Sequence, residues 1–166
     1  MPTPEEQARK IIDQKLTAAG WIVQDFKQLN LGAGPGVAVR EFMTASGPAD
    51  YVLFVDRQAV GIVEAKKAGT TLSGVFEQSA RYMTSFPADI PHVELPLPFS
   101  YESTGVEIRF VDLRDPDYRS RRVFHFHRPE TLREWLTQPD TLRARLREMP
   151  AQFPLIEKGL WDAQIE

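Results

Sequence analysis

The sequence predicts one α/β domain with a central mixed sheet of about five strands and flanking helices. The first observation is an apolar stretch, residues 47–67, whose pattern is typical of a β-hairpin covered on both faces. The second is a helical pattern on each side of that stretch, over residues 4–19 and 73–85. The third is size, because 166 residues with 42% hydrophobic content are enough for one hydrophobic core.

Composition excludes several classes of protein. The net charge of −3 and the pI near 5.7 argue against a uniformly basic surface, so any contact with nucleic acid must use a local patch or a metal ion. The absence of cysteine excludes disulfides, thiolate zinc sites and a cysteine nucleophile. The N-terminus lacks the apolar core of a signal peptide, and no apolar run approaches the ~18 residues of a membrane span. We therefore expect a soluble, cytoplasmic protein with no membrane partner.

The first helix is expected to begin at Pro4, before two acids that favour a helix N-terminus, and to end at Gly20. Glu5 is the first residue of the stripe that should pack inward, whereas Glu6 lies on the polar side. Two interpretations of Glu5 stay open: an ordinary N-terminal acid, or part of a functional site. The other residues of this stripe are Ala8, Arg9, Ile12, Leu16 and Ala19.

The hairpin carries charged residues at one end. Its first strand begins near Asp50, its turn falls near residues 56–58, and its return strand, Ala59–Lys66, ends with charged side chains. Pairing around this turn places Asp50 nearly opposite Glu64.

Alternation along the return strand predicts that Glu64 and Lys66 share one face of the sheet, the face of Val60 and Ile62. Two carboxylates and an ammonium at the end of an apolar hairpin are costly unless they are paired or bind a metal. Without metal the carboxylates should repel one another, so we expect Asp50→Asn to raise the melting temperature of the metal-free domain.

The rest of the chain gives weaker signals. The glycines of residues 31–36 match no phosphate-binding fingerprint and predict a turn. In the second helix, Gln78 and Tyr82 lie at i and i+4 and share one face, either by chance in a half-buried helix or as functional residues. Prolines make residues 89–99 irregular. Further strands are expected at Val37–Phe42, Glu107–Leu113 and Arg122–Phe126, and further helices at Pro129–Leu136 and Pro139–Met149.

Residues 114–128 hold five arginines and two histidines with interleaved aromatic residues. Such a stretch can bind a phosphate backbone, but a solvated loop and strand edge is the commoner structure. Arg81, Arg121 and Arg122 are the candidate DNA contacts. His125 and His127 lack an evident third ligand, so a zinc site is not expected.

The charged end of the hairpin suits one chemistry well. Oxygen ligands such as Asp50 and Glu64 favour Mg²⁺ or Mn²⁺ over metals that prefer softer ligands. A neighbouring Lys66 can neutralise the charge that develops on a phosphoryl group or help to deprotonate a metal-held water. Together they predict hydrolysis of a phosphodiester.

These motifs resemble the PD-(D/E)xK nuclease superfamily and, within it, the N-terminal domain of the restriction (R, motor) subunit of type I restriction enzymes. PEEQAR with IDQKLTAAGW is similar to that family's first helix, ADYVLFVD followed by GIVEAKK to its catalytic hairpin, and QSARY to the QxxxY motif of RecB-like nucleases. Proline stands two places before the aspartate, so the literal PD dipeptide is absent. The resemblance implies that Asp50 and Glu64 are metal ligands and that Lys66 is the catalytic lysine. It also implies that Gln78 and Tyr82 position DNA or the lysine, and that Glu5 is the acid of the first helix.

The resemblance further implies a larger assembly. Residues 1–150 would form the endonuclease-like domain, and residues 151–166 a linker whose GLWDAQIE resembles the start of a helicase motor absent from this chain. The implied function is Mg²⁺-dependent, non-specific cleavage of double-stranded DNA after translocation by that motor, which alone would use ATP. The implied partners are DNA and the methyltransferase and specificity subunits. The alternatives are a catalytically inactive domain that binds DNA or docks subunits, and a structural-RNA or repair nuclease of the same superfamily.

Overall fold

The computed structural model describes residues 1–166 except residues 2, 73–80, 154–155, 157 and 160–166. The expected second helix and its Gln78 fall largely outside the described residues, and so does most of the expected linker. The described elements are α1 (Pro4–Ala18), β1 (Ile22–Asp25), η1 (Phe26–Gln28), β2 (Gly36–Thr44), β3 (Gly47–Val55), β4 (Gln58–Ala65), β5 (Phe99–Ser103), β6 (Ile108–Asp112), β7 (Arg121–Val123), α3 (Pro129–Thr137) and α4 (Leu142–Gln152).

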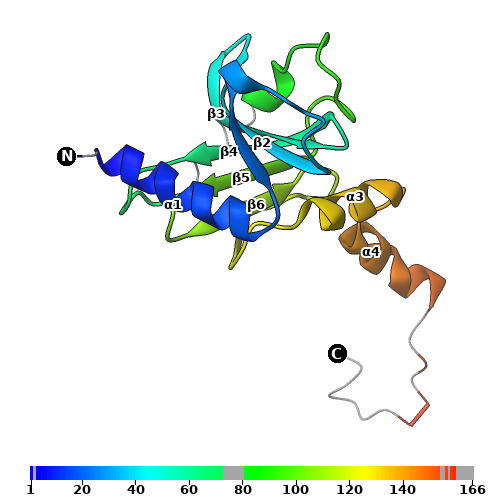
Figure 1. Ribbon diagram of the computed structural model, residues 1–166. Coiled ribbons are helices and arrows are strands. Elements are labelled where there is room, and N and C mark those ends of the chain that lie inside the picture. The colour runs from blue at the N-terminus through cyan, green and yellow to red at the C-terminus, as the bar shows by residue number, and fades with distance from the viewer. Residues whose placement is uncertain (2, 73–80, 154–155, 157, 160–166) are drawn as a thin grey trace.

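The strands form one mixed sheet of seven strands in chain order, from β1 to β7 (Figure 1). Strands β1/β2 and β4/β5 pair in parallel, and the other neighbours are antiparallel. The α/β class and the mixed sheet are therefore confirmed, but the predicted count of about five strands is wrong. The two strands without a prediction of their own are β1, which is short, and β5, whose buried Ser100 and Glu102 resemble the polar residues of a loop.

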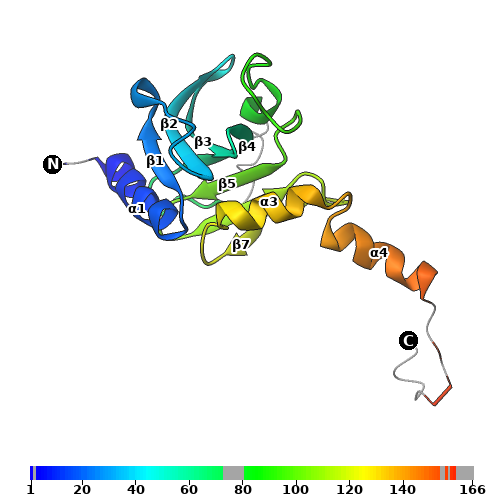
Figure 2. The same ribbon diagram turned by 45° about the vertical axis from the view of Figure 1, so that its right-hand side comes forward.

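The β3–β4 hairpin lies between two hydrophobic cores, which confirms that both of its faces are covered. On one face, α1 contributes Ile12 and Leu16 to a core with β3, β4, β5 and β6 (Figure 1). Helix α3 also lies against the sheet (Figure 2). Its Leu132 belongs to the same core as α1, and its Trp135 packs against the aromatic rings of Phe99 and Phe110. On the opposite face, Phe42 and Phe86 stack within the second core. Burial on both faces fixes the strand register, because a slip by one residue would exchange the two faces.

A β-bulge corrects one detail of the predicted hairpin. The pairing of β3 with β4 shifts between Leu53 and Phe54, so that one extra residue is accommodated on β4. As a result Val60 packs in the core under α1, whereas Ile62 packs in the core on the other face. The prediction that these two residues share a face is therefore wrong.

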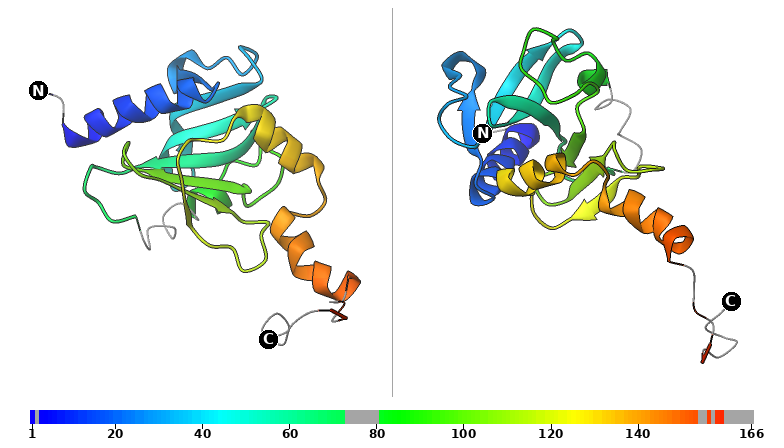
Figure 3. Two further views of the ribbon diagram at one scale, coloured as in Figure 1. Left: turned by 90° about the horizontal axis from the view of Figure 1, so that it is seen from below. Right: turned by 90° about the vertical axis from the view of Figure 1, so that its right-hand side faces the viewer.

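Helix α4 stands apart from the two cores and projects from the body of the domain (Figures 2 and 3). None of its residues is buried, and Leu142, Leu146 and Met149 are exposed along it. Within the described residues, no helix combines the length and apolarity that a membrane span needs.

Candidate active site

Four acidic residues from four adjacent strands lie in a row across the sheet. Glu41 of β2 stands opposite Asp50 of β3, because the residues on either side of them pair with one another. The pairing of β3 with β4 continues from Tyr51 and Val63, which sets Asp50 beside Glu64. Glu64 in turn pairs with Glu102 of β5. The predicted neighbourhood of Asp50 and Glu64 is therefore confirmed, and it extends over two further acids.

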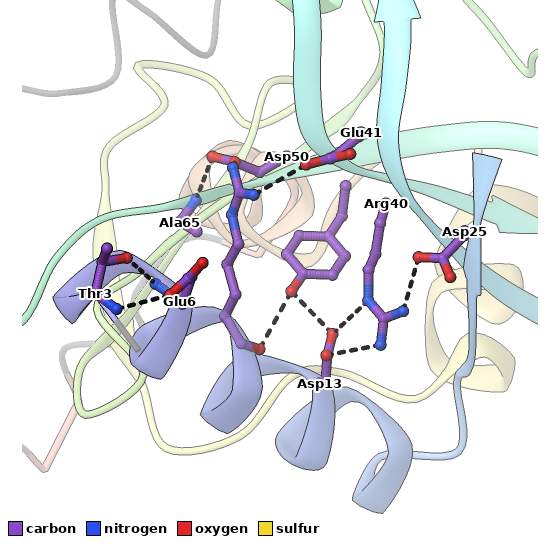
Figure 4. Close-up of polar contacts among 10 residues, drawn as sticks. Thr3, Glu6, Asp13, Asp25, Arg40, Glu41, Asp50 and Ala65 are labelled. Atoms are coloured by element: carbon purple, nitrogen blue, oxygen red, sulfur yellow. Dashed lines mark hydrogen bonds and ion pairs between the residues drawn. The ribbon is translucent and has the colours of Figure 1, made fainter. Parts of the chain in front are cut away.

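Asp50 is held at both of its carboxylate oxygens. Its Oδ2 accepts a hydrogen bond from the backbone N–H of Ala65 at 2.9 Å, which ties β3 to the end of β4 (Figure 4). Its Oδ1 accepts a hydrogen bond from Nη2 of Arg9 on α1 at 2.5 Å, and Nη1 of the same guanidinium lies 3.1 Å from Oε1 of Glu41. Arg9 therefore joins two of the four acids.

Glu64 is a buried acid of this row, and its pKa is strongly raised. Its side chain is 3% exposed, and its Oε1 accepts no hydrogen bond within the described part of the chain. Burial and, to a smaller extent, the negative charges of Asp50 and Glu102 raise the pKa of Glu64 to about 7, although Lys66 lowers it. The ammonium of Lys66 lies 3.7 Å from the other oxygen, Oε2.

The position of α1 is fixed by a second polar network next to this site. Asp13 of α1 accepts two hydrogen bonds from Arg40 of β2, at 3.1 and 2.7 Å, and one from the hydroxyl of Tyr51 at 2.9 Å (Figure 4). Arg40 also donates to Asp25 at 2.9 Å. Because these contacts join α1 to β2 and β3, they place Arg9, one turn earlier on the helix, against Asp50.

The donor set fits a hard divalent cation. Mg²⁺ is usually bound through one or two carboxylates and keeps several waters. Asp50 and Glu64 supply two adjacent carboxylates, and Oε1 of Glu64, which accepts no hydrogen bond from any described residue, is the kind of buried acceptor that a cation would satisfy. The described residues contain no group of three or more histidine, aspartate or glutamate side chains suited to a metal. Among the described residues, the two carboxylates leave room for the waters that Mg²⁺ usually keeps.

The residues predicted in the two helices lie in different surroundings. Glu5 is exposed, which contradicts the expectation that it heads the inward face, while Glu6 forms a capping box with Thr3. Tyr82 is half-buried against the core opposite α1. Gln78 lies outside the described residues, so its role stays a prediction.

Among the candidate DNA contacts, Arg81 and Arg122 are exposed. Arg121 is partly engaged, because its guanidinium lies 3.6 Å from Asp115 and over the ring of Phe110. Arg122 continues the charged row, since Glu102 pairs with Arg109 of β6 and Arg109 pairs with Arg122 of β7.

Much of the arginine-rich stretch has a structural role. Arg114 binds both carboxylate oxygens of Asp112 and lies over the ring of Phe99. His127 contacts the hydroxyl of Tyr101 at 2.6 Å, and burial lowers the pKa of His127 to about 4. This histidine is therefore neutral, and it is half-buried against the aromatic rings of Phe110 and Trp135.

Three residues of the site had no functional role predicted from the sequence: Arg9, Glu41 and Glu102. A signal existed for Arg9, which is the one cation on the inward stripe of the first helix. None was evident for Glu41, because its contact depends on how α1 lies against β2. None was evident for Glu102 either, because Ser100 and Glu102 make the strand resemble a polar loop in the sequence.

Comparison with known proteins identifies relatives of one kind. Residues 32–102 match the family described as the second domain of the endonuclease subunit of the type I restriction enzyme EcoKI. The chain is 30% identical to the EcoKI endonuclease subunit of Escherichia coli (strain K12) over an alignment that covers 80% of this chain and 16% of the subunit.

Among solved structures, the fold is similar to one described as a fragment of an HsdR subunit of a type I restriction enzyme from Vibrio vulnificus YJ016. The TM-score is 0.56 at 18% identity, and the match covers 80% of this chain and 25% of the other. The chain therefore spans about a sixth of the length of its curated relative, and about a quarter of the solved chain. Sequence and fold together show that this chain belongs to the family of type I restriction enzyme endonuclease (R) subunits, where it corresponds to an N-terminal region.

Proposed function

We propose that this domain is a nuclease of the PD-(D/E)xK type that hydrolyses phosphodiester bonds of double-stranded DNA with the help of Mg²⁺ or Mn²⁺. One observation carries the proposal: at the end of the hairpin where the motif falls, Glu64 is buried beside Asp50, and its Oε1 has no hydrogen-bond partner among the residues that the structure describes. A buried carboxylate of this kind is destabilising unless a cation or proton compensates it.

Each side chain of the site has a role in this proposal. Asp50 and Glu64 would hold the cation, and the N–H of Ala65 orients Asp50 for that purpose. When bound, the cation would lower the pKa of a coordinated water and neutralise charge on the scissile phosphate. Lys66, beside Glu64, would stabilise the negative charge that develops on the phosphoryl oxygens. Tyr82 and Gln78 would position DNA or the lysine.

The whole protein's activity is also a matter of proposal, because the chain spans 16% of its curated relative. We infer that cleavage by the complete subunit is non-specific and follows ATP-driven translocation by a motor domain beyond this chain. The methyltransferase and specificity subunits would be its partners, and ATP would bind only to the motor.

The runner-up is a catalytically inactive domain that binds DNA or docks other subunits. It would have no use for Glu64, whose burial raises its pKa to about 7 and whose Oε1 lacks a partner within the described part of the chain. In a catalytic domain, by contrast, the energetic cost of burying the Glu64 carboxylate would be explained by its role as a metal ligand.

The decisive experiment measures nicking of supercoiled plasmid with Mg²⁺ or Mn²⁺, at high protein concentration, beside metal binding by calorimetry. Wild type should nick DNA and bind metal, and Glu64→Ala should lose both. The matched control is Glu94→Ala, since Glu94 is an exposed acid. Nicking that persists in Glu64→Ala would place the active site elsewhere. Wild type that neither nicks nor binds metal would favour the docking domain.

A further inference from the structure

We propose that Arg9 is an internal counter-ion that occupies Asp50 in the metal-free protein, and that a divalent cation displaces Arg9 from Asp50 while Glu41 retains the guanidinium. This inference rests on the proposed metal site and assigns a positioning role to a residue outside the motif.

The ion pair between Arg9 and Asp50 is short and partly buried. Arg9 places Nη2 at 2.5 Å from Oδ1 of Asp50, and Asp50 is 16% exposed at its side chain. The other oxygen, Oδ2, accepts the N–H of Ala65 (Figure 4). Both carboxylate oxygens of Asp50 therefore accept hydrogen bonds in the metal-free protein.

Of the two partners of Asp50, the N–H of Ala65 and the guanidinium of Arg9, only the second can move away easily. The N–H of Ala65 belongs to the backbone of β4, which pairs on both edges within the sheet. Arg9 reaches Asp50 through a flexible side chain that is 42% exposed. A guanidinium and a divalent cation at the same carboxylate would also repel each other at short range. Arg9 is therefore the partner that yields.

Glu41 can hold the guanidinium of Arg9 after it leaves Asp50. Its Nη1 already lies 3.1 Å from Glu41, whose side chain is 69% exposed, so this contact can persist after the contact with Asp50 is lost. Glu41 has φ +51°, a left-handed conformation that is uncommon for a residue other than glycine and that tends to occur at functional sites. A cavity of about 730 Å³, lined by Arg9, Glu41, Asp50 and Lys27 among others, gives the side chain room to move.

Helix α1 itself need not move when Arg9 leaves Asp50. Asp13 fixes α1 to Arg40 and Tyr51 independently of Asp50. The exchange is therefore confined to one side chain, and its effect should appear in metal affinity rather than in the fold.

The test compares wild type with Arg9→Gln by calorimetric titration with Mn²⁺ and by melting with and without saturating Mn²⁺. Arg9→Gln should bind Mn²⁺ about tenfold more tightly, which corresponds to about 1.4 kcal/mol. Without metal it should melt below wild type, because the ion pair with Asp50 is lost. In saturating Mn²⁺ that difference should disappear, because the pair is already broken in wild type.

The matched control is Arg133→Gln, which removes another arginine bound to an aspartate. Arg133 lies 2.6 Å from both oxygens of Asp56, far along the hairpin at its turn. This variant should leave the Mn²⁺ affinity unchanged and should melt below wild type equally with and without metal.

The role of Glu41 is tested by a double-mutant cycle. Glu41→Gln should weaken Mn²⁺ binding in the wild-type background, because Arg9 then holds Asp50 alone, and should have a smaller effect when Arg9→Gln is present. Equal effects in both backgrounds would overturn the role of Glu41.

Wild type that binds Mn²⁺ with the same affinity as Arg9→Gln, or a melting difference that persists in saturating Mn²⁺, would overturn the displacement of Arg9. Failure of wild type and Arg9→Gln alike to bind Mn²⁺ would overturn the metal site as well, so the two failures are distinguishable.

Discussion

Glu64 and Glu102 stand side by side on the parallel strands β4 and β5, both buried. Like charges on directly opposed residues destabilise a sheet, and burial adds the cost of desolvation. Burial, which is the largest cause, and the negative charges of Asp50 and Glu102 together raise the pKa of Glu64 to about 7, although Lys66 lowers it.

The first prediction concerns the pH dependence of stability without metal. The pKa of Glu64 rises from 4.5 to about 7 on folding, so the folded state binds the proton more tightly. The resulting stability is fully present below pH 4.5 and is lost as the pH rises through about 7, by up to roughly 3 kcal/mol. Urea unfolding between pH 5 and 8 measures it. The difference in stability between Glu64→Gln and wild type should grow in favour of the mutant as the pH rises; a constant difference would contradict the raised pKa.

The second prediction reverses an expectation from the sequence. Repulsion among the acids predicts that Asp50→Asn raises the melting temperature, but Asp50 is held by Arg9 and by the N–H of Ala65. Losing this partly buried ion pair should cost roughly 1 kcal/mol and lower the melting temperature of the metal-free domain by about 2–4 °C. Thermal melting in EDTA tests this result. A higher melting temperature would mean that repulsion outweighs the two contacts.

The third prediction concerns Gly61, where β4 approaches β5 closely. A Cβ at this position would lie 2.3 Å from the carbonyl oxygen of Phe99 and 2.8 Å from its Cβ. Because the obstacle is backbone, Gly61→Ala should destabilise the domain by at least about 2 kcal/mol. Chemical denaturation measures the change. Gly69→Ala is the comparison: its Cβ would meet nothing within 4 Å, although its φ of +84° carries a backbone strain of its own. Similar losses of stability in both variants would show that the clash with the backbone of Phe99 is not what destabilises Gly61→Ala.

The fourth prediction separates two neighbouring arginines. Arg122 is exposed, so Arg122→Ala should weaken DNA binding uniformly across sequences and reduce the salt slope by about 1. Arg121 pairs with Asp115 and lies over Phe110, so Arg121→Ala should chiefly lower the melting temperature. Fluorescence anisotropy at several salt concentrations, with melting curves for both variants, tests the distinction. We expect weak binding overall, since the net charge is −3.

The elements that the sequence predicts well are those with local signals. Pro4 and Gly20 mark the ends of α1, and Pro129 marks the start of α3, because proline and glycine restrict backbone conformation locally. The tight turn brings Asp50 and Glu64 close together, but their exact pairing depends on the β-bulge, because the pairing of Val55 with Gln58 at the turn would otherwise set Asp50 opposite Val63.

The features that escaped prediction depend on contacts distant in sequence. Alternation cannot reveal the β-bulge that turns Val60 to the face of α1, because the extra residue is accommodated only by pairing with β3. Similarly, burial of Glu102 depends on what packs over β5, and the ion pair of Arg9 depends on where α1 lies. Local pattern identified the metal-ligand candidates but not their counter-ions.

The attachment of α1 has a consequence for synthesis of the protein. The helix leaves the ribosome before the strands that hold it, because its polar contacts are with Arg40, Asp50 and Tyr51, which lie 27 to 41 positions after their partners on the helix. With 15 residues, α1 is at the length where an isolated helix is only marginally stable in water. A nascent chain therefore cannot secure its first helix until β3 has emerged, and nascent chains released before Tyr51 should leave α1 open to proteolysis.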